Sequence, residues 1–400
     1  MAAAGTAFQA GSAAIDSSTI MAALILQLTG SPLAVGAVPA ILRLGWLTPQ
    51  IFVGYFAERS GASMPFYAGG AFGRTAAIAL LAAVLWHGSA ADWRPVSLGA
   101  AALALWTLYA FVSGIVGVPY NDIVARSVPS NRRSRLLALR FFGGGLVALA
   151  VAALADHIVR TADFPVSYAA VLWIAAALML VSSVVFVSMG EPERAGIPKG
   201  AESFAAYFRE GRMAFRNDTR FRWFVFAQWC GGATLIAAPF YVVAAAEMGL
   251  GLENIALLLG AQTSGALASN LLWGWWGDTR GKLSLMRLIS FLRLAPPLIL
   301  LAVLFLEMAH MQMLIALVAV FLLLGALANG LTIAVLGLLM EISPEHRRPS
   351  YSGYFNALTA PAFVLPLLGG VIYAAIGAEA VFFLSAVSAV GQGYALAQIR

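Results

Sequence analysis

The sequence has little cysteine and little charge. Cys230 is the single cysteine in 400 residues, which excludes an intramolecular disulfide and a site built from several thiolates. Charged residues make up 10% of the chain, whereas a soluble domain carries roughly 25%. The chain therefore lacks the polar surface that a water-soluble fold of this length needs.

Histidine and enzyme motifs are equally scarce. The four histidines are scattered near the ends of predicted apolar spans, so we expect no metal site. The sequence contains no phosphate loop, no H-E-x-x-H and no G-x-S-x-G. We therefore expect neither an enzyme nor a nucleotide-driven motor, and we expect no cofactor.

Long apolar runs fill most of the chain, and 61% of its residues are hydrophobic. A helix needs roughly 20 apolar residues to cross a bilayer. Runs bounded by charge, proline or glycine predict an all-α membrane protein with about twelve spans, at residues 6–29, 33–56, 64–87, 96–121, 136–159, 167–189, 223–247, 253–276, 284–306, 311–340, 351–376 and 378–398.

One charged segment divides the spans into two sets of six. Residues 190–222 lie between the sixth and seventh spans and are rich in charged side chains. Within them, residues 204–215 are expected to form a surface helix. We therefore predict a six-helix bundle at 1–189, a charged linker at 190–222 and a second six-helix bundle at 223–400.

The net charge of +6 comes from basic residues that lie beside apolar spans, which indicates membrane topology and no nucleic-acid partner. Eighteen Lys and Arg fall in the linker and in the loops on its side, against two in the opposite loops. Because basic loops resist translocation, we expect the linker and both termini to be cytosolic in a multi-pass protein of the inner membrane. We also expect the chain to act as a monomer.

A short pattern recurs in the two halves. Gly54, Glu58 and Gly61 are followed 220 residues later by Gly274, Asp278 and Gly281, and each set closes a predicted span. A second pair of similar segments begins at Pro129 and Pro344, and each ends in two arginines. Two related halves that both start from the cytosol must be related by an axis along the membrane normal.

The recurring segments resemble the hallmark G-x-x-x-D-R-x-G-R-[RK] of the major facilitator superfamily of secondary transporters. The first copy has Glu58 in place of Asp and lacks the trailing basic pair, whereas the second copy keeps Asp278 and a base. The resemblance covers the full chain and implies two six-helix bundles that alternate access to a central site. We expect the turns to act as a cytosolic latch, the alternative being a plain loop anchor. The predicted latch residues are Gly54, Glu58, Arg59, Gly61, Gly274, Asp278, Gly281, Lys282, Arg132, Arg133, Arg347 and Arg348.

Charges within the spans mark the predicted site, because a charge at mid-bilayer costs roughly 2.5 to 3.5 kcal/mol even on a lenient scale. Asp16 and Arg43 are expected at similar depth in neighbouring helices, as a switchable pair in which Asp16 accepts a proton. Gln9, Ser12 and Asp16 would share one helix face with Thr19. The other predicted cavity residues are Gln50, Gln228, Thr263, Asn270 and Asn329.

The alternatives stay open at this point. Asp16 and Arg43 also fit a permanent structural pair, and Arg74 and Arg293 are buried charges that fit pairing with neighbours or snorkelling. We expect a proton-coupled or ion-coupled secondary transporter of a small anionic or polar solute. The competing interpretations are a non-transporting membrane sensor or assembly factor on the same scaffold and, within transport, a drug-efflux antiporter.

Overall fold

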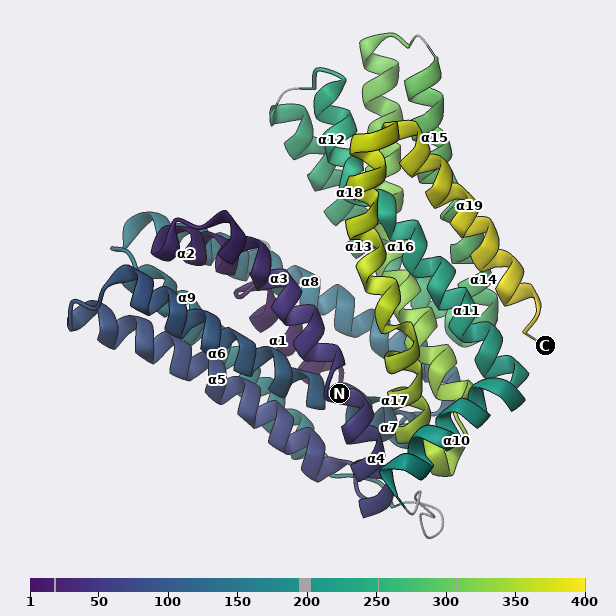
Figure 1. Ribbon diagram of the computed structural model, residues 1–400, viewed down its shortest axis with the longest axis horizontal. Coiled ribbons are helices and arrows are strands. Elements are labelled where there is room, and N and C mark those ends of the chain that lie inside the picture. Colours follow the sequence, from purple (N-terminus) through teal and green to yellow (C-terminus); the bar gives the residue numbers. More distant parts are fainter. Residues whose placement is uncertain (18, 194–202, 251, 307, 400) are drawn as a thin grey trace. The chain divides into compact units, whose positions relative to one another are not determined.

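The computed structural model describes residues 1–400 except 18, 194–202, 251, 307 and 400 (Figure 1). The regular elements of these residues are helices, without a strand. The predicted linker at 190–222 falls partly on 194–202, which lie outside the described residues.

The chain forms two compact units. Unit 1 comprises Met1–Val128, Leu139–Glu202 and Ser343–Ala357, and unit 2 comprises Pro129–Ala138, Ser203–Ile342 and Leu358–Arg400. Each unit therefore takes a short segment from the opposite half of the sequence. The predicted division at 190–222 describes the two sequence halves and stays a prediction.

Unit 1 is built mainly from the N-terminal helices, and α5 packs against both α6 and α9. The helices are α1 (Ala2–Ala13), α2 (Ile20–Thr29), α3 (Pro32–Leu47), α4 (Gln50–Ser60), α5 (Met64–Ala90), α6 (Pro95–Ile115), α7 (Gly117–Ser127), α8 (Ser130–Thr161), whose first residues belong to unit 2, α9 (Val166–Val187), η2 (Glu345–Arg347) and α17 (Arg348–Thr359), of which residues up to 357 belong to unit 1.

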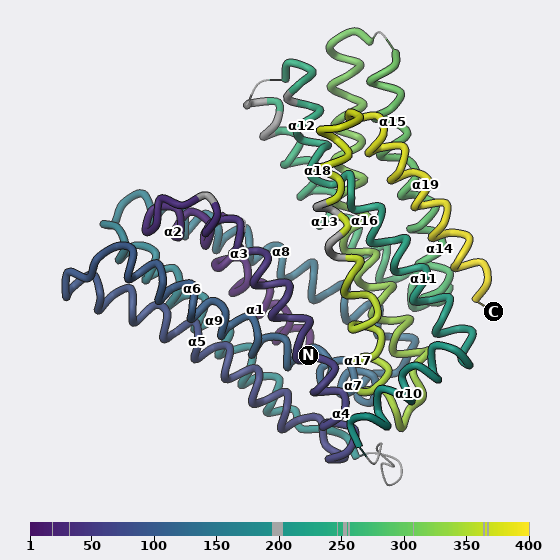
Figure 2. The backbone as a smooth tube through the Cα atoms, viewed as in Figure 1, coloured from purple at the N-terminus to yellow at the C-terminus, as the bar shows by residue number. Residues whose placement is uncertain are grey.

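Unit 2 contains α10 (Phe204–Asn217), α11 (Thr219–Ala233), η1 (Thr234–Ala237), α12 (Phe240–Glu247), α13 (Leu252–Thr279), α14 (Lys282–Leu292), α15 (Ala295–Phe305), α16 (His310–Ile342), η3 (Ala360–Val364), α18 (Leu365–Ile376) and α19 (Ala378–Ala397). α10 confirms the predicted surface helix. Figure 2 shows α13 and α16 side by side. A Cβ added at Gly265 would lie 2.1 Å from the Leu322 carbonyl oxygen, and one at Gly325 would lie 1.8 Å from that of Gln262. Glycine is required at this crossing because the two backbones almost touch.

Several predicted spans are interrupted. The prediction of one continuous helix at 6–29 is wrong, because α1 ends at Ala13 and α2 begins at Ile20. Asp16-Ser-Ser-Thr19 fills most of the gap, and such side chains offer the backbone local hydrogen bonds that compete with a helix. Proline accompanies other breaks, at Pro49 between α3 and α4 and at Pro296, the second residue of α15 after the break that follows α14.

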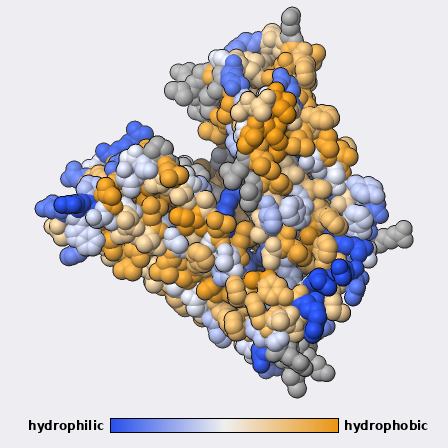
Figure 3. Space-filling view, in the orientation of Figure 1, coloured by the Kyte–Doolittle hydropathy of each residue, from blue (hydrophilic) through white to orange (hydrophobic). Residues whose placement is uncertain are grey.

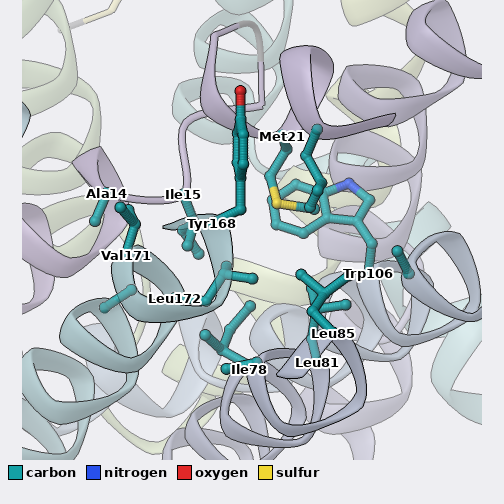
Figure 4. Packing of buried hydrophobic residues seen from close by; sticks show 14 of the residues in the cluster. Ala14, Ile15, Met21, Ile78, Leu81, Leu85, Trp106, Tyr168, Val171 and Leu172 are labelled. Carbon is teal, nitrogen blue, oxygen red and sulfur yellow. The ribbon is translucent and has the colours of Figure 1, made fainter. Parts of the chain in front are cut away.

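The core of unit 1 gathers around Trp106 of α6, which is fully buried. Figure 4 shows Met21 of α2, Leu81 of α5 and Leu172 of α9 in the same cluster. The Trp106 indole N–H donates a hydrogen bond to the carbonyl oxygen of Val38 at 2.9 Å. This buried hydrogen bond holds α6 against α3.

The outer helix faces are apolar. Trp86 of α5, Val181 of α9 and Phe383 of α19 are among the exposed large hydrophobic residues, and hydrophobic residues cover much of the surface visible in Figure 3. In the part of the chain that the structure describes, nine helical segments are long and apolar enough to cross a membrane. Such faces suit contact with lipid, as expected of a multi-pass membrane protein.

Candidate functional site

Asp16 lies in the gap between α1 and α2. Its Oδ1 accepts hydrogen bonds from the backbone N–H and from the hydroxyl of Thr19, each at 2.9 Å, and its side chain is exposed. Arg43 is exposed on α3. The described hydrogen bonds of Asp16 go to the residue that precedes α2, so its pairing with Arg43 stays a prediction.

The predicted polar face of the first helix changes with this gap. Gln9 and Ser12 lie in α1, whereas Asp16 and Thr19 lie beyond its end, so the four do not follow one helical face. Gln9 packs on α8, where a Cβ added at Gly144 would lie 2.5 Å from Gln9 Cβ. The buried Ser12 hydroxyl has no hydrogen-bond partner among the described residues. The break is the physical reason for the correction, because it ends the three-four spacing.

Gln50 is fully buried at the start of α4. Its amide nitrogen donates to the Trp46 carbonyl oxygen at 2.8 Å, and its side-chain oxygen accepts from the amide of Asn356 in α17. These bonds satisfy the side chain within unit 1. The structure thus gives Gln50 a packing contact, and its predicted place in a cavity stays a prediction.

Two predicted cavity residues of unit 2 meet at one carbonyl. Asn270 of α13 and Asn329 of α16 both donate to the carbonyl oxygen of Ala266, at 2.8 and 3.4 Å. The Thr263 hydroxyl is exposed on α13 and donates to Leu259 at 3.0 Å. Gln228 of α11 has a buried side-chain oxygen without a hydrogen-bond partner in the described residues. The structure therefore brings Asn270 and Asn329 together. The described contacts of Thr263 and Gln228 do not include either asparagine.

The first latch turn holds its acid against an arginine. Glu58 is 2% exposed, and its Oε1 lies 3.7 Å from the Nε of Arg347, which belongs to the segment that unit 1 takes from the C-terminal half. Gly61 ends α4 with φ of +73°, a conformation that suits glycine. Gly54 is buried in α4. The structure thus brings two of the predicted latch residues, Glu58 and Arg347, together, and their role as a latch stays a prediction.

The second latch turn holds its acid through backbone groups. Asp278 accepts hydrogen bonds from the backbone N–H groups of Ser134 and Arg135 in α8, at 2.8 and 2.9 Å. Its Oδ1 lies 3.7 Å from Lys282 Nζ, which is 3.4 Å from Glu341. Gly281 has φ of +88°. An acid near the start of a helix is favoured by the helix dipole, so the turn binds α8 firmly.

The remaining predicted latch residues lie around these turns. Gly274 is packed against α8, because an added Cβ would lie 2.6 Å from that of Ala138. The other four are arginines. Arg59 donates to the Tyr55 hydroxyl at 2.9 Å, and Arg348 lies 3.7 Å from Glu345. Arg133 is buried and Arg132 is exposed. The second acid is therefore held by backbone N–H groups next to Arg132 and Arg133, which the sequence pattern did not predict.

Sequence reasoning missed a buried charge network in unit 1. Arg126 of α7 pairs with Asp122 at 2.7 Å and also contacts the carboxylate of Glu191. The Ser63 hydroxyl donates to Asp122 at 2.6 Å, and the Ser63 and Met64 backbone N–H groups donate to Glu191. The four-residue spacing of Asp122 and Arg126 was the available signal. Glu191 thus caps α5 beside the turn that has lost its basic pair.

Arg74 of α5 is buried against aromatic rings. Its guanidinium carbon lies 4.1 Å from the centre of the Phe8 ring, and that of Arg140 lies 5.6 Å from the same ring and 5.0 Å from the Tyr120 ring. The aromatic faces stabilise both cations by cation–π attraction. Arg74 therefore fits the structural interpretation of a buried cation held by its neighbours.

Arg293 follows α14 at the break before α15 and lines a cavity of about 90 Å³ in unit 2. Its guanidinium donates to the side-chain oxygen of Gln392 at 3.1 Å and to the Gly231 carbonyl oxygen at 3.0 Å. Polar side chains of Thr234, Tyr241 and Ser385 also line this cavity. The sequence placed Arg293 in a span, and the structure adds the cavity beside it.

The comparisons with known proteins agree with this architecture. Residues 235–391 match the model of the Major Facilitator Superfamily. The chain has the fold of this superfamily. The fold that the resemblance implies is thereby confirmed, and the expected arrangement of twelve helices in two repeats fits. No curated protein sequence matches the chain.

Three solved structures of transporters share the fold. A bacterial homologue of the iron transporter ferroportin, in an outward-facing state, has a TM-score of 0.79 and 14% identity, covering 99% of this chain and 97% of that one. The E. coli fucose:proton symporter FucP has a TM-score of 0.73 and 16% identity over 100% and 98% of the two chains. The human organic anion transporter MFSD10 has a TM-score of 0.72 and 14% identity over 98% of each chain. These neighbours are transporters and not enzymes, and at these identities the likeness shows the fold alone.

Proposed function

We propose that this chain is a secondary active transporter that moves a small anionic or polar solute across the inner membrane by alternating access, coupled to protons. The observation that carries the proposal is Asp16, an exposed carboxylate in a gap between two helices of the first span. A carboxylate in such a place is costly unless it is used, and it is well suited to taking up and releasing a proton. The linker and both termini are then cytosolic, as the basic loops indicate.

The two latch turns support the alternating mechanism. Glu58 and Asp278 each contact a segment that lies in the other half of the sequence, at Arg347 and at the start of α8. Contacts of this kind stabilise one conformational state and are absent from another. A proton or solute that binds the two states with different affinities shifts the population between them.

The fold does not name the solute. The three neighbours are described as an iron transporter homologue, a fucose:proton symporter and an organic anion transporter. Our preference for an anionic or polar solute rests on the arginines of this chain, because Arg43, Arg74 and Arg293 all lie in predicted spans. A cation in a span attracts negative groups strongly, since little water screens it.

The test is proton movement in proteoliposomes that contain a trapped pH-sensitive dye. Solutes from a panel of sugars, carboxylates, phosphates and amines are added outside, and solute-dependent proton movement is recorded for the wild-type chain. Asp16→Asn should abolish that movement, because the amide cannot carry the proton. Asp156→Asn is the matched control, since Asp156 is 61% exposed and pairs only with Arg160 in its described contacts. Unchanged proton movement in Asp16→Asn, with intact insertion, would remove Asp16 from the mechanism.

A further inference from the structure

The cavity beside Arg293 lies wholly within unit 2, between broken helices. η1 interrupts the seventh span, and the break between α14 and α15 interrupts the ninth. Arg293 contributes one positive charge to the lining of this cavity. The rest of the lining consists of Leu and Ala side chains, Pro296 and the polar residues already named. The cavity therefore has one cationic end and apolar sides.

The charge of Arg293 has no acidic partner among the residues that the structure describes. This differs from Lys282 and Arg126, which lie beside carboxylates. Arg293 instead uses neutral acceptors, Gln392 and Gly231, which orient the guanidinium without neutralising it. A buried cation held in this way leaves N–H donors for an anion, because the two described bonds do not use all the donors of a guanidinium.

Three hydroxyl groups line the cavity. Two of them donate hydrogen bonds to backbone carbonyl oxygens, and the third is available to a ligand. Thr234 donates to the Gly231 carbonyl oxygen at 2.8 Å, and Ser385 donates to that of Thr234 at 2.9 Å, so both hydrogens are used to hold η1 in place. Tyr241 lines the cavity, is 3% exposed and makes no hydrogen bond in the described part of unit 2. Its hydroxyl is therefore free to donate to a ligand beside Arg293.

The residue that orients the guanidinium has a buried donor of its own. Gln392 is fully buried, and its Nε2 has no hydrogen-bond partner in the described residues. Gln392 contacts Arg293 through its oxygen, so it does not neutralise the charge of the guanidinium. Two cavity-lining residues, Tyr241 of α12 and Arg293 at the α14–α15 break, thus supply donors, and Gln392 of α19 holds Arg293 from outside the lining.

We propose that this cavity binds the carboxylate of a small aliphatic acid. The planar guanidinium matches a carboxylate in two-point geometry, and the Tyr241 hydroxyl supplies a further donor. The volume of about 90 Å³ equals that of roughly three water molecules. It suits a carboxylate with a short alkyl group against the leucines of α16, and the apolar sides disfavour a strongly hydrated divalent anion such as phosphate.

The inference deepens the proposed function, because it names the class of solute, and it rests on that proposal only for the step of transport. Binding is tested on the full chain in lipid nanodiscs by equilibrium binding of radiolabelled butyrate. The wild-type chain should bind butyrate saturably, and unlabelled propionate should compete whereas phosphate should not. Arg293→Gln should weaken binding by at least about tenfold, because it removes the charged donor.

Two further variants keep the result interpretable. Tyr241→Phe removes only a hydroxyl and should weaken binding by roughly threefold to tenfold, the range for one hydrogen bond to a charged group. Arg287→Gln is the matched control, because Arg287 lies in α14 of the same unit, donates to the carbonyl oxygens of Leu396 and Ile399 and does not line the cavity, and it should leave butyrate binding unchanged. Each variant is compared after its helix content and its size-exclusion profile match those of the wild type.

The outcomes separate the two proposals. Absence of saturable butyrate binding by the wild type, or equal binding by Arg293→Gln and Tyr241→Phe, overturns the carboxylate site, even if Asp16-dependent proton movement is seen with another solute. Butyrate binding that requires Arg293 and Tyr241 supports the site, even if no solute moves protons and the transport proposal fails.

Discussion

The two latch turns use glycine in the same place but hold their acids differently. Gly61 and Gly281 both have positive φ, with ψ of −3° and 155°. In its described contact Glu58 lies 3.7 Å from the Nε of Arg347, whereas Asp278 accepts two backbone N–H groups and lies near a buried lysine. Backbone donors in a helix lose little freedom when they bind, but a long side chain must be ordered first. The repeat therefore keeps the turn and varies the strength of its charge contacts.

The two turns differ in how firmly each holds a segment from the other half of the sequence. The contacts of Asp278 fix the start of α8 in unit 2, and the contact of Glu58 is the weaker hold on the η2 segment in unit 1. If both act as latches, the turn at Glu58 opens at a lower free-energy cost than the turn at Asp278.

The largest effect is expected for Asp278→Asn. The change removes the charged acceptor of two N–H groups and one carboxylate beside Lys282, so we expect a loss of about 3 kcal/mol in the free energy of unfolding. Glu58→Gln should cost about 1 kcal/mol, because the described contact with Arg347 is 3.7 Å long and the Arg347 side chain is 24% exposed. The midpoint of thermal unfolding in detergent measures both. Asp92→Asn, in an exposed loop, is the control, and a larger loss for Glu58→Gln than for Asp278→Asn would break the comparison.

The next effect concerns the two glycines. Gly281→Ala should cost about 2 kcal/mol, because φ of +88° with ψ of 155° is a conformation that residues with a Cβ rarely adopt. Gly61→Ala should cost about 1 kcal/mol, since its left-handed conformation is less strained for alanine. Thermal unfolding again gives the result. Equal midpoints for Gly281→Ala and the wild type would show that the second turn does not need glycine.

The smallest effect is a gain. Ala62 occupies the position that Lys282 holds in the second copy, 220 residues later. Ala62→Lys places a base after Gly61, close in sequence to Glu58, and should stabilise the chain by about 0.3 to 0.5 kcal/mol, within the range of an exposed ion pair. A double variant with Glu58→Gln should lose that gain. Stabilisation that persists in the double variant would show that the lysine acts on some other group.

Much of the fold followed from apolar runs, whereas the helix breaks did not. Hydropathy shows that a segment prefers lipid but does not show whether its backbone stays helical, as the gap at Asp16 illustrates. A run of four residues that all favour local side-chain bonds was the missed signal there. The breaks at Pro49 and Pro296 are proline breaks, yet Pro39 lies inside α3 without ending it.

The candidate site was predictable in its local parts only. The glycines of the two turns follow from the repeat, and Gly61 and Gly281 have positive φ. Both Glu58 and Arg347 were predicted as latch residues, but the repeat did not show that they lie together. Contacts between distant segments, such as Glu191 with the start of α5 or Arg293 with Gln392, depend on the packing of helices and leave no pattern in the sequence. Their discovery required coordinates.

Hydrogen exchange of the chain in nanodiscs tests most directly whether each turn holds a segment of the opposite sequence half. Asp278→Asn should speed exchange at residues 130–138 and leave 343–357 unchanged, and Glu58→Gln should do the reverse with a smaller increase. Identical exchange in both segments for both variants, or no change in either, would contradict this assignment of the two turns.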